Sequence, residues 1–332
     1  MKAIRITGPG GPDVLRLEEV PDPEPGPEDV VVDVRAAALN RADLLQRQGH
    51  YPAPPGAPQD IPGLEAAGVV SAVGERVRGV EPGDRVMALL GGGGYAERVR
   101  VPAGMALPVP AMLSFVEAAA IPEVFFTAYD ALFRQADFSV GESVLVHAAG
   151  GGVGTAALQL ARVGGASAVL GTASAPKLEG IEREGLPLDV PIDYRSEAFD
   201  QVVAERTGGR GVDVILDMVG GDYLDPDLRS LAALGRVVIV GLLRGRSAEA
   251  DLGRLLRGRL RVLGTALRSR SAAEKLALTA EVRERLLPLF ERGSLRAVVD
   301  RTFPIAQAAA AHAYMEADEN LGKIVLEVGG GS

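Results

Sequence analysis

The sequence contains no cysteine, no tryptophan and only three histidines, His50, His147 and His312. Without cysteine, the chain has no disulfide, no thiol nucleophile and no cysteine-ligated zinc. A zinc site built from histidine would need all three histidines to converge, although they lie far apart in the sequence. We therefore expect no metal site.

Acidic residues outnumber basic ones, 44 to 35, and long apolar runs are absent. The formal net charge is −9 and the isoelectric point is about 5.1, so no basic surface for nucleic acid or an anionic membrane is indicated. No apolar run is long enough to cross a bilayer, and the N-terminal residues lack the apolar core of a signal peptide. With 332 residues, 47% of them hydrophobic, we expect a cytoplasmic protein of two domains that acts on small molecules.

A glycine-rich turn organises the rest of the chain. Residues 144–146 form a short apolar run typical of a buried parallel strand, and residues 158–161 continue a helical pattern. Between them lie Gly151, Gly152, Val153 and Gly154, in a pattern one methyl group away from the G-x-G-x-x-G fingerprint. Because a second strand is expected at 168–172, we interpret the segment as a dinucleotide-binding βαβ unit and not as a simple turn.

The end of that second strand predicts the cofactor. An NAD site places Asp or Glu there to bind the ribose hydroxyls. Here the strand continues into Ser174 and Lys177, and no acid appears until Glu179. A hydroxyl and an ammonium attract a 2′-phosphate, so NADPH is favoured. The alternative for Lys177 is an ordinary solvated lysine, although the chain has only four.

The pattern divides the chain into two domains. Short strands separated by Pro-Gly pairs, typical of a β-barrel-like domain, are expected at 1–6, 30–36, 68–74, 84–88 and 95–99. A capping box at 114–117 begins a helix, and the pattern resumes from about 125 to 134 after the interruption at Pro122. Strands at 213–217, 236–240 and 261–265 complete a doubly wound parallel sheet of the Rossmann type. A long helix at 271–290 and a strand at 324–328, which returns to the first domain, end the chain.

Several motifs in this order resemble a known family. The segments that carry the resemblance are 38–43, 46–52, 63–68, 82–86, 118–123, 127–128, 147–154, 311–317 and 320–325. Together they resemble the zinc-free quinone oxidoreductase branch of the medium-chain dehydrogenase/reductase superfamily, closest to its p53-inducible type. The resemblance implies an α/β fold with a GroES-like catalytic domain at 1–120, completed by about 268–332, and an NADPH-binding Rossmann domain at 121–267.

The resemblance also implies a zinc-independent reaction. Zinc-using relatives have a cysteine where this chain has Asn40, a histidine where it has Leu64, and another cysteine close to Glu123. A quinone is electron-poor and accepts a hydride without a Lewis acid. The implied activity is therefore reduction of a small-molecule quinone by NADPH, with one-electron and two-electron routes both open.

Site residues follow from the same resemblance. Asn40 and Thr127 are expected beside the nicotinamide, and Asp43 and Tyr51 between the domains. The remaining implied cofactor contacts are Ser174, Lys177 and Tyr194 at the 2′-phosphate, Val219, Gly241 and Leu242 at the nicotinamide ribose, and Leu267 and Asn320 at the closure of the site. A second tyrosine found between positions 40 and 51 in some quinone reductases is absent, because Leu45 and Gln46 stand there.

Each of these residues has a structural alternative. Tyr51 is also suited to packing on the proline-rich loop that follows it, Asn40 and Asp43 to capping a helix, and Tyr194 to the edge of the core. His147 is interpreted as structural, His312 and Tyr314 as helix packing, and Glu65 as structural or supporting.

Two alternative functions remain open, as does the assembly. A proton-donating Tyr51 would favour an enoyl or alkenal double-bond reductase. A blocked site would favour an NADPH-binding sensor or structural protein with little turnover. By resemblance we also expect a homodimer, formed by the exposed edge strand at 261–265.

Overall fold

The computed structural model describes residues 1–329, which divide into two compact units. The first unit consists of Met1–Phe126 together with the chain from Arg268 onward, and the second of Thr127–Leu267. Within the described residues, none of the helices combines the length and the apolar character needed to cross a bilayer.

The second unit is a doubly wound parallel sheet. Its strands are β8 (Ser143–Val146), β9 (Ala168–Ala173), β10 (Val190–Asp193), β11 (Val212–Asp217), β12 (Leu231–Ile239) and β13 (Arg261–Gly264). All pairs are parallel, and the order is β10-β9-β8-β11-β12-β13. The sheet thus has the strand order of the dinucleotide-binding fold, with its switch point between β8 and β11. This confirms the expected α/β class and Rossmann sheet.

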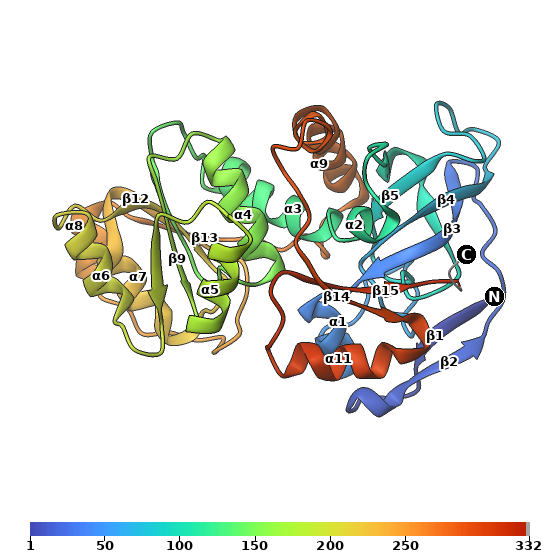
Figure 1. Cartoon of the computed structure of the whole chain (residues 1–332), viewed down its shortest axis with the longest axis horizontal. Coiled ribbons are helices and arrows are strands. Elements are labelled where there is room, and N and C mark those ends of the chain that lie inside the picture. The colour runs from blue at the N-terminus through green and yellow to red at the C-terminus, as the bar shows by residue number, and fades with distance from the viewer. Residues whose placement is uncertain (330–332) are drawn as a thin grey trace. The chain divides into compact units, whose positions relative to one another are not determined.

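Helices cover both faces of this sheet. They are α4 (Gly152–Val163), α5 (Ala175–Arg183), α6 (Phe199–Arg206), α7 (Leu224–Ser230) and α8 (Leu252–Gly258). Figure 1 shows α4 and α5 on one face and α6, α7 and α8 on the other. Because both faces are covered, the central strand β8 is apolar, and its residues Val144, Leu145 and Val146 are completely buried.

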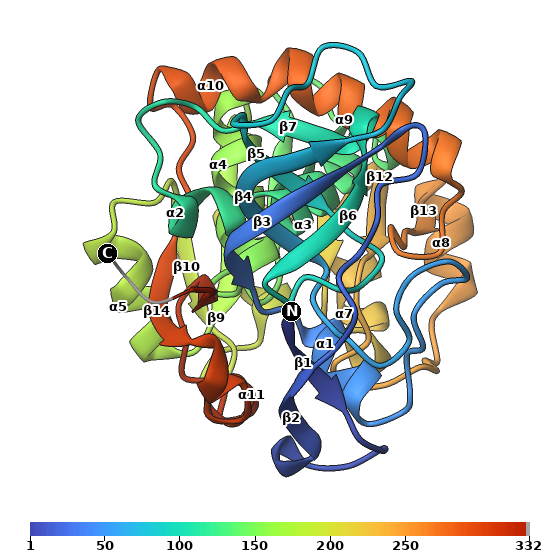
Figure 2. The ribbon, with the colours of Figure 1, turned by 90° about the vertical axis from the view of Figure 1, so that its right-hand side faces the viewer.

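The first unit is built on a mostly antiparallel seven-strand sheet. Its strands, in the order β14-β15-β3-β4-β5-β7, are β14 (Val299–Pro304), β15 (Lys323–Glu327), β3 (Asp29–Ala38), β4 (Glu65–Val73), β5 (Arg85–Leu89) and β7 (Ala106–Pro108), and β6 (Arg98–Pro102) also pairs with β3. Figure 2 shows β3 running through the middle of this sheet. β6 pairs with its first half and β15 with its second half. The C-terminal strand therefore returns to the first unit, as expected.

Helices and a small hairpin complete the first unit. β1 (Lys2–Ile6) and β2 (Leu15–Glu19) form a separate antiparallel pair. The helices are α1 (Arg41–Arg47), α2 (Phe115–Ala119), α9 (Ala272–Arg285), α10 (Leu287–Glu291), α11 (Ala308–Glu316) and the first part of α3 (Pro122–Tyr129), which continues into the second unit. Their apolar side chains and those of the sheet form a core that includes Val30, Val32, Ala311, Met315 and Leu326.

Three expectations about local structure are corrected. The strand expected at 95–99 begins only at Arg98, because the backbone of Tyr95 pairs with Pro62 and Ile4 and not with β3. The helix expected at 271–290 is divided at Leu286, two residues before Pro288, whose ring excludes a continuous helix. Pro122 begins α3 instead of interrupting a helix, since proline is tolerated in the first turn.

Candidate functional site

The glycine turn after β8 is tightly packed. Ala148 has a φ of 47°, which is unusual for a residue with a side chain, and its carbonyl accepts a hydrogen bond from the Gly151 N–H at 2.9 Å. A Cβ atom added to Gly154 would lie 2.3 Å from that carbonyl oxygen, so only glycine fits. The turn leaves the first N–H groups of α4 without helical partners, which makes this end of α4 suitable for an anionic pyrophosphate.

A second loop lies at the end of β11, across the switch point. The Asp217 carboxylate accepts hydrogen bonds from the N–H groups of Val219, at 2.7 Å, and Gly220, at 2.9 Å. The Gly241 N–H donates to the Asp217 carbonyl at 3.3 Å. The structure thus brings the predicted residues Val219 and Gly241 to the same end of the sheet, with Leu242 beside them and 52% exposed.

The end of β9 has the polar character expected for a 2′-phosphate site. Ser174 is the N-cap of α5, but its hydroxyl makes no capping hydrogen bond to the helix. The stem of Lys177 covers Gly150, since a Cβ atom there would lie 2.9 Å from Lys177 Cβ. Tyr194 is 39% exposed, and the guanidinium of Arg195 lies 5.9 Å from its ring centre. Arg195 adds a second cation that our sequence analysis did not identify.

His147 is enclosed beneath this end of the sheet. Its Nε2 atom lies 2.7 Å from a carboxylate oxygen of Asp227, and its Nδ1 atom 2.9 Å from the Thr172 hydroxyl. Phe199 and Tyr223 pack edge-on against the ring. Burial raises the pKa of Asp227 to about 6. With no exposed surface and a complete set of partners, His147 has the surroundings of a structural histidine.

In the first unit, a buried ion pair surrounds Asn40. The Lys323 ammonium lies 2.7 Å from Glu65 Oε1 and donates to Asn40 Oδ1, also at 2.7 Å. The Asn40 amide donates to the same Glu65 oxygen at 2.9 Å. Lys323 is 3% exposed and Glu65 is completely buried. Two charged side chains therefore fix both ends of the Asn40 amide, which is more than helix capping requires.

Asp43 is a buried carboxylate that accepts hydrogen bonds from three segments of the same unit. Its carboxylate accepts hydrogen bonds from the N–H groups of Asn40, at 2.8 Å, and Gly63, at 3.0 Å, and from the Tyr95 hydroxyl at 3.2 Å. Complete burial raises its pKa to about 6 although these donors lower it. The Tyr95 hydroxyl lies 3.3 Å from His312 Nε2, and burial lowers the pKa of that imidazole to about 3, so it stays neutral. The contact with the Asn40 N–H is the capping role left open for Asp43.

Tyr51 lies under a buried arginine. The Arg268 guanidinium is 5.1 Å from the centre of the Tyr51 ring and donates to the Tyr51 carbonyl at 3.0 Å. It also donates to the side chain of Gln46 at 2.5 Å and to the Gly91 carbonyl at 3.0 Å. Burial raises the pKa of Tyr51, against the charge of Arg268, so the phenol stays protonated. Gln46 thus positions the arginine that covers Tyr51.

For the remaining predicted residues, the structure shows burial and few side-chain contacts. Asn320 is 6% exposed and donates to the Gly322 carbonyl at 2.8 Å. Thr127 and Leu267 are 8% and 5% exposed and are the first and last residues of the second unit. Within the first unit, the Asn40 N–H donates to the Asp43 carboxylate. Within the second unit, the N–H groups of Val219 and Gly241 both donate to Asp217.

Three residues of this region were not assigned a binding or catalytic role from the sequence. Glu65 was expected to be only structural or supporting, whereas Lys323 and Glu123 had no role. The Glu123 N–H donates to Glu65 Oε2 at 2.8 Å, so Glu65 connects Asn40, Lys323 and Glu123. The one available signal was that all of them lie in segments carrying the family resemblance.

The residues around Asn40 do not suit a zinc ion. Glu65 Oε1 and Asn40 Oδ1 both contact the Lys323 ammonium, and Glu65 Oε2 accepts a hydrogen bond from the Glu123 N–H. Zinc would have to bind beside that positive charge, with no thiolate or imidazole at either position. Among residues 1–329, no group of three His, Asp or Glu side chains has the arrangement of a metal site.

The β8 end of the second unit, by contrast, suits a dinucleotide. It combines the glycine turn, the free N–H groups of α4, and the hydroxyl and ammonium after β9. These are the features that a pyrophosphate and a ribose phosphate require.

Known proteins and protein families are similar to this chain in both units. The family model for the alcohol dehydrogenase GroES-like domain matches residues 26–111, and that for zinc-binding dehydrogenases matches residues 186–326. The chain is 36% identical to the human synaptic vesicle membrane protein VAT-1 homolog, covering 99% of this chain and 87% of that protein. It is 34% identical to rat quinone oxidoreductase, covering 98% and 97%.

Solved structures show the same similarity. An NAD-dependent alcohol dehydrogenase superposes with a TM-score of 0.87 and 33% identity, covering 99% of this chain and all of the other. CurK enoyl reductase gives 0.87 and 30%, covering 99% of each chain. Mycobacterial Rv1454c complexed with NADPH gives 0.86 and 31%, covering 98% of this chain and all of the other.

Proposed function

Because this chain belongs to the medium-chain dehydrogenase/reductase superfamily and is an oxidoreductase of that family, we propose that it is an NADPH-dependent, zinc-independent quinone reductase. The observation that carries the proposal is the Lys323–Glu65–Asn40 cluster. An ammonium there offers no coordination position to an alcohol or carbonyl oxygen. The acceptor should therefore be one that needs no Lewis acid, as a quinone does.

The choice of NADPH rests on the end of β9. Ser174 keeps its hydroxyl available, Lys177 lies over the glycine turn, and β9 ends in Ala173 with no carboxylate to repel a phosphate. Similar structures include both an NAD-dependent enzyme and an NADPH complex, so the local chemistry carries this part of the proposal.

In the proposed mechanism, bound NADPH supplies a hydride from its nicotinamide ring. The N-terminus of α4 would bind the pyrophosphate, while Ser174, Lys177 and Tyr194 would hold the 2′-phosphate. Val219 and Gly241 would line the ribose. Asn40, with its amide fixed by Lys323 and Glu65, would orient the nicotinamide, and Tyr51 would contact the acceptor. Proximity and orientation then provide most of the acceleration.

Oxidation of NADPH, followed at its absorbance band, tests the proposal. The acceptors are an ortho-quinone, a para-quinone and a small enone, each repeated with NADH. We expect rapid oxidation with a quinone and a clear preference for NADPH. Binding of NADPH without reduction of any acceptor would instead support the sensor function.

A double-bond reductase is the second candidate. CurK enoyl reductase is among the similar structures, and Tyr51 keeps its proton because burial raises its pKa. A protonated phenol can donate to the α-carbon of an enone. Oxidation of NADPH with the enone alone would favour this candidate.

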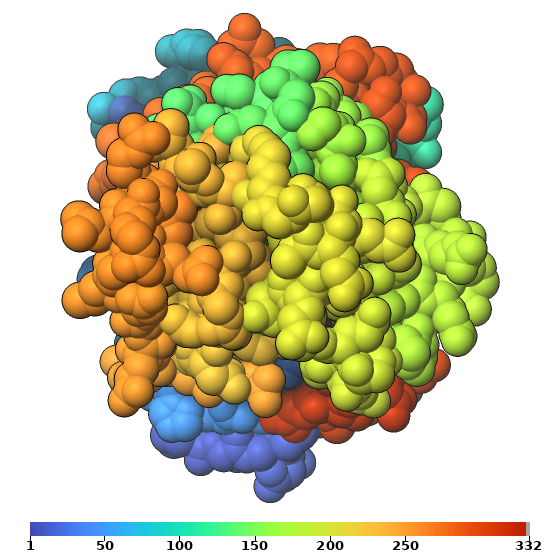
Figure 3. All heavy atoms as spheres, turned by 90° about the vertical axis from the view of Figure 1, so that its left-hand side faces the viewer, coloured from blue at the N-terminus to red at the C-terminus, as the bar shows by residue number. Residues whose placement is uncertain are grey.

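We also propose a homodimer formed through β13. This strand lies at the end of the sheet order, so one of its edges has no partner within the described sheet. Nearby, Leu252 and Leu256 on α8 are 73% and 77% exposed, and Val262 on β13 is 39% exposed. The orange segment in Figure 3 contains α8 at the surface of this unit. We expect a dimer mass in sedimentation analysis and a monomer for Val262→Lys.

The cytoplasmic location of the protein stays a prediction.

A further inference from the structure

Glu123 is positioned by the cluster that holds Asn40. It is the second residue of α3, and its N–H donates to Glu65 Oε2 at 2.8 Å. The other oxygen of Glu65 contacts the Asn40 amide at 2.9 Å and the Lys323 ammonium at 2.7 Å. The start of α3 is therefore fixed to the same carboxylate that fixes the predicted nicotinamide-binding residue.

The Glu123 carboxyl group differs from the other acids of this region. Asp43 and Glu65 are completely buried, and their oxygens are occupied by hydrogen bonds and an ion pair. Glu123 is largely buried but keeps some exposed surface, and within residues 1–329 its carboxyl oxygens have no hydrogen bond or ion pair. It is the acid of this group that retains both free oxygen atoms and access from outside.

Burial and the neighbouring carboxylates favour the protonated form of Glu123, whereas the neighbouring cations oppose it. Glu65 and Asp43 face it as like charges, Lys323, Arg268 and Lys275 as opposite charges, and the Tyr51 hydroxyl as a neutral group. The three cations are already engaged: Lys323 by Glu65, Arg268 by carbonyl and amide oxygens, and Lys275 by the Arg268 carbonyl at 2.8 Å. Burial, followed by the charge of Glu65, raises the pKa of Glu123 to about 8.

We propose that Glu123 is the proton donor of the reaction, transferring its carboxyl proton to the oxygen anion of the reduced quinone. The inference rests on the proposed quinone reductase function. Tyr51 is the other nearby proton carrier, but the phenol is the weaker acid, since its pKa is raised from an already high value. An acid that titrates near the working pH is the more effective donor.

The step is balanced in atoms and electrons. A hydride passes from NADPH to the quinone, so that NADPH is oxidised to NADP⁺ and the quinone becomes a hydroquinone anion. The O–H bond of Glu123 breaks, a new O–H bond forms on the anion, and Glu123 is left as a carboxylate. A proton from water restores the acid, so one quinone, one NADPH and one proton give hydroquinone and NADP⁺.

The test compares the pH profiles of kcat for wild type, Glu123→Gln and Glu123→Asp, with a para-quinone and saturating NADPH. We expect the wild-type kcat to be level below about pH 8 and to fall above it with a single ionisation. Glu123→Gln should lower kcat about 100-fold and remove that ionisation, whereas Glu123→Asp should restore part of both. Glu75→Gln, an exposed acid of the same unit, is the matched control and should behave as wild type.

Three further readouts separate the possible failures. Circular dichroism and the dissociation constant of NADPH should be the same for Glu123→Gln and wild type, because the carboxyl oxygens hold no other group in place. If wild type reduces quinones but Glu123→Gln keeps its kcat and pH profile, the role of Glu123 is wrong and the quinone reductase proposal survives. If wild type reduces no quinone, the proposed function fails first. Infrared titration of the carboxyl band then decides separately whether Glu123 is an acid near pH 8, and an ordinary pKa would overturn its assignment.

Discussion

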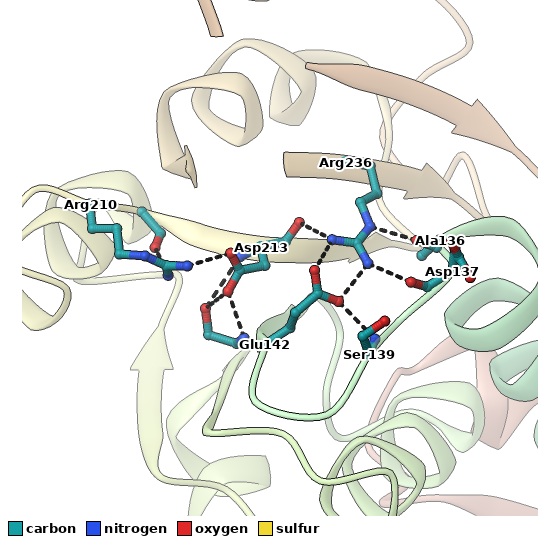
Figure 4. A network of polar contacts seen from close by, with 9 residues as sticks. Ala136, Asp137, Ser139, Glu142, Arg210, Asp213 and Arg236 are labelled. Atoms are coloured by element: carbon teal, nitrogen blue, oxygen red, sulfur yellow. Dashed lines mark hydrogen bonds and ion pairs between the residues drawn. The ribbon is translucent and has the colours of Figure 1, made fainter. Parts of the chain in front are cut away.

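The two units of this protein use buried charge in opposite ways. In the second unit, Arg236 is 4% exposed and donates to Glu142 at 2.5 and 2.6 Å, to the Ala136 carbonyl at 2.6 Å and to the Asp137 carbonyl at 3.0 Å. Figure 4 shows this clamp, with Asp213 beside it. In the first unit, the buried charges of Lys323 and Glu65 surround the predicted nicotinamide-binding residue Asn40.

The pKa values of carboxyl groups shift in opposite directions in the two units: downward for Glu142 in the second unit, and upward for Asp43 and Glu123 in the first. Burial by itself raises the pKa of Glu142, but hydrogen bonds from Arg236 and the Ser139 N–H outweigh it and lower the pKa below its ordinary value. For Asp43 and Glu123, burial prevails and the pKa rises to about 6 and about 8. A carboxylate held charged by a guanidinium fixes neighbouring loops, whereas Glu123, whose pKa of about 8 keeps it protonated at neutral pH, is available for proton transfer. Asp43, with a pKa of about 6, is mostly ionised there.

The largest expected effect is in the first unit. Lys323→Met removes the only cation that contacts Glu65 within residues 1–329 and leaves a buried carboxylate unpaired, which should lower the free energy of unfolding by about 3–5 kcal/mol. Urea denaturation followed by circular dichroism measures the change. Lys2→Met, at an exposed lysine of the same unit, is the control. If Lys323→Met lowered the free energy of unfolding no more than the control does, Lys323 would not be needed to stabilise the buried Glu65 carboxylate.

Removing the clamp of the second unit should have a smaller effect that depends on pH. Arg236→Met should lower the free energy of unfolding by about 1–3 kcal/mol at neutral pH, because the carbonyl groups of Ala136, Asp137 and Asp213 lose this donor and Glu142 stays partly solvated. The folded-state pKa of Glu142 is lowered from 4.5, so its stabilisation is present above that value and is lost as pH falls through the folded pKa. The difference between mutant and wild type should therefore shrink in acid, and a difference that grew there would contradict the assignment.

Cofactor binding by the second unit is expected to depend on backbone packing. Gly154→Ala would place a Cβ atom 2.3 Å from the Ala148 oxygen, so the start of α4 must move. We expect NADPH to bind about 10- to 100-fold more weakly, equivalent to about 1–3 kcal/mol, as measured by titration calorimetry. Gly264→Ala, where the added Cβ has no neighbour within 4 Å, is the matched control and should keep wild-type affinity.

The smallest predicted change concerns an accessible charge. Lys177→Met removes one cation from the 2′-phosphate region, so kcat/KM with NADPH should fall about tenfold while that with NADH stays nearly constant. Steady-state kinetics with both cofactors measures the ratio. Arg183→Met, at the other end of α5, should leave it unchanged. Equal losses with NADPH and NADH would show that Lys177 does not distinguish them.

The succession of strands and helices in the second unit could be predicted closely from the sequence. Apolar runs predicted β8 and β9, and the glycine spacing predicted the start of α4, because these signals come from residues that are neighbours along the chain. The same local signals failed where a distant contact or a proline decides the outcome. Tyr95 is buried against Asp43 instead of beginning a strand, and the helix that follows Ser271 ends at the turn before Pro288.

Sequence alone predicted the family and the dinucleotide fold, which are confirmed, because their motifs are local. The site residues Asn40, Ser174 and Lys177 also lie in local motifs, and their roles stay predictions. Only the tertiary structure decided what surrounds them. Lys323 reaches Asn40 across 283 positions, and Glu123 reaches Glu65 across 58. Such pairs form because β15 returns to β3 and α3 begins beside β4. The protonation of a carboxyl group depends on its burial and on charges from distant segments, and these are properties that no local pattern contains.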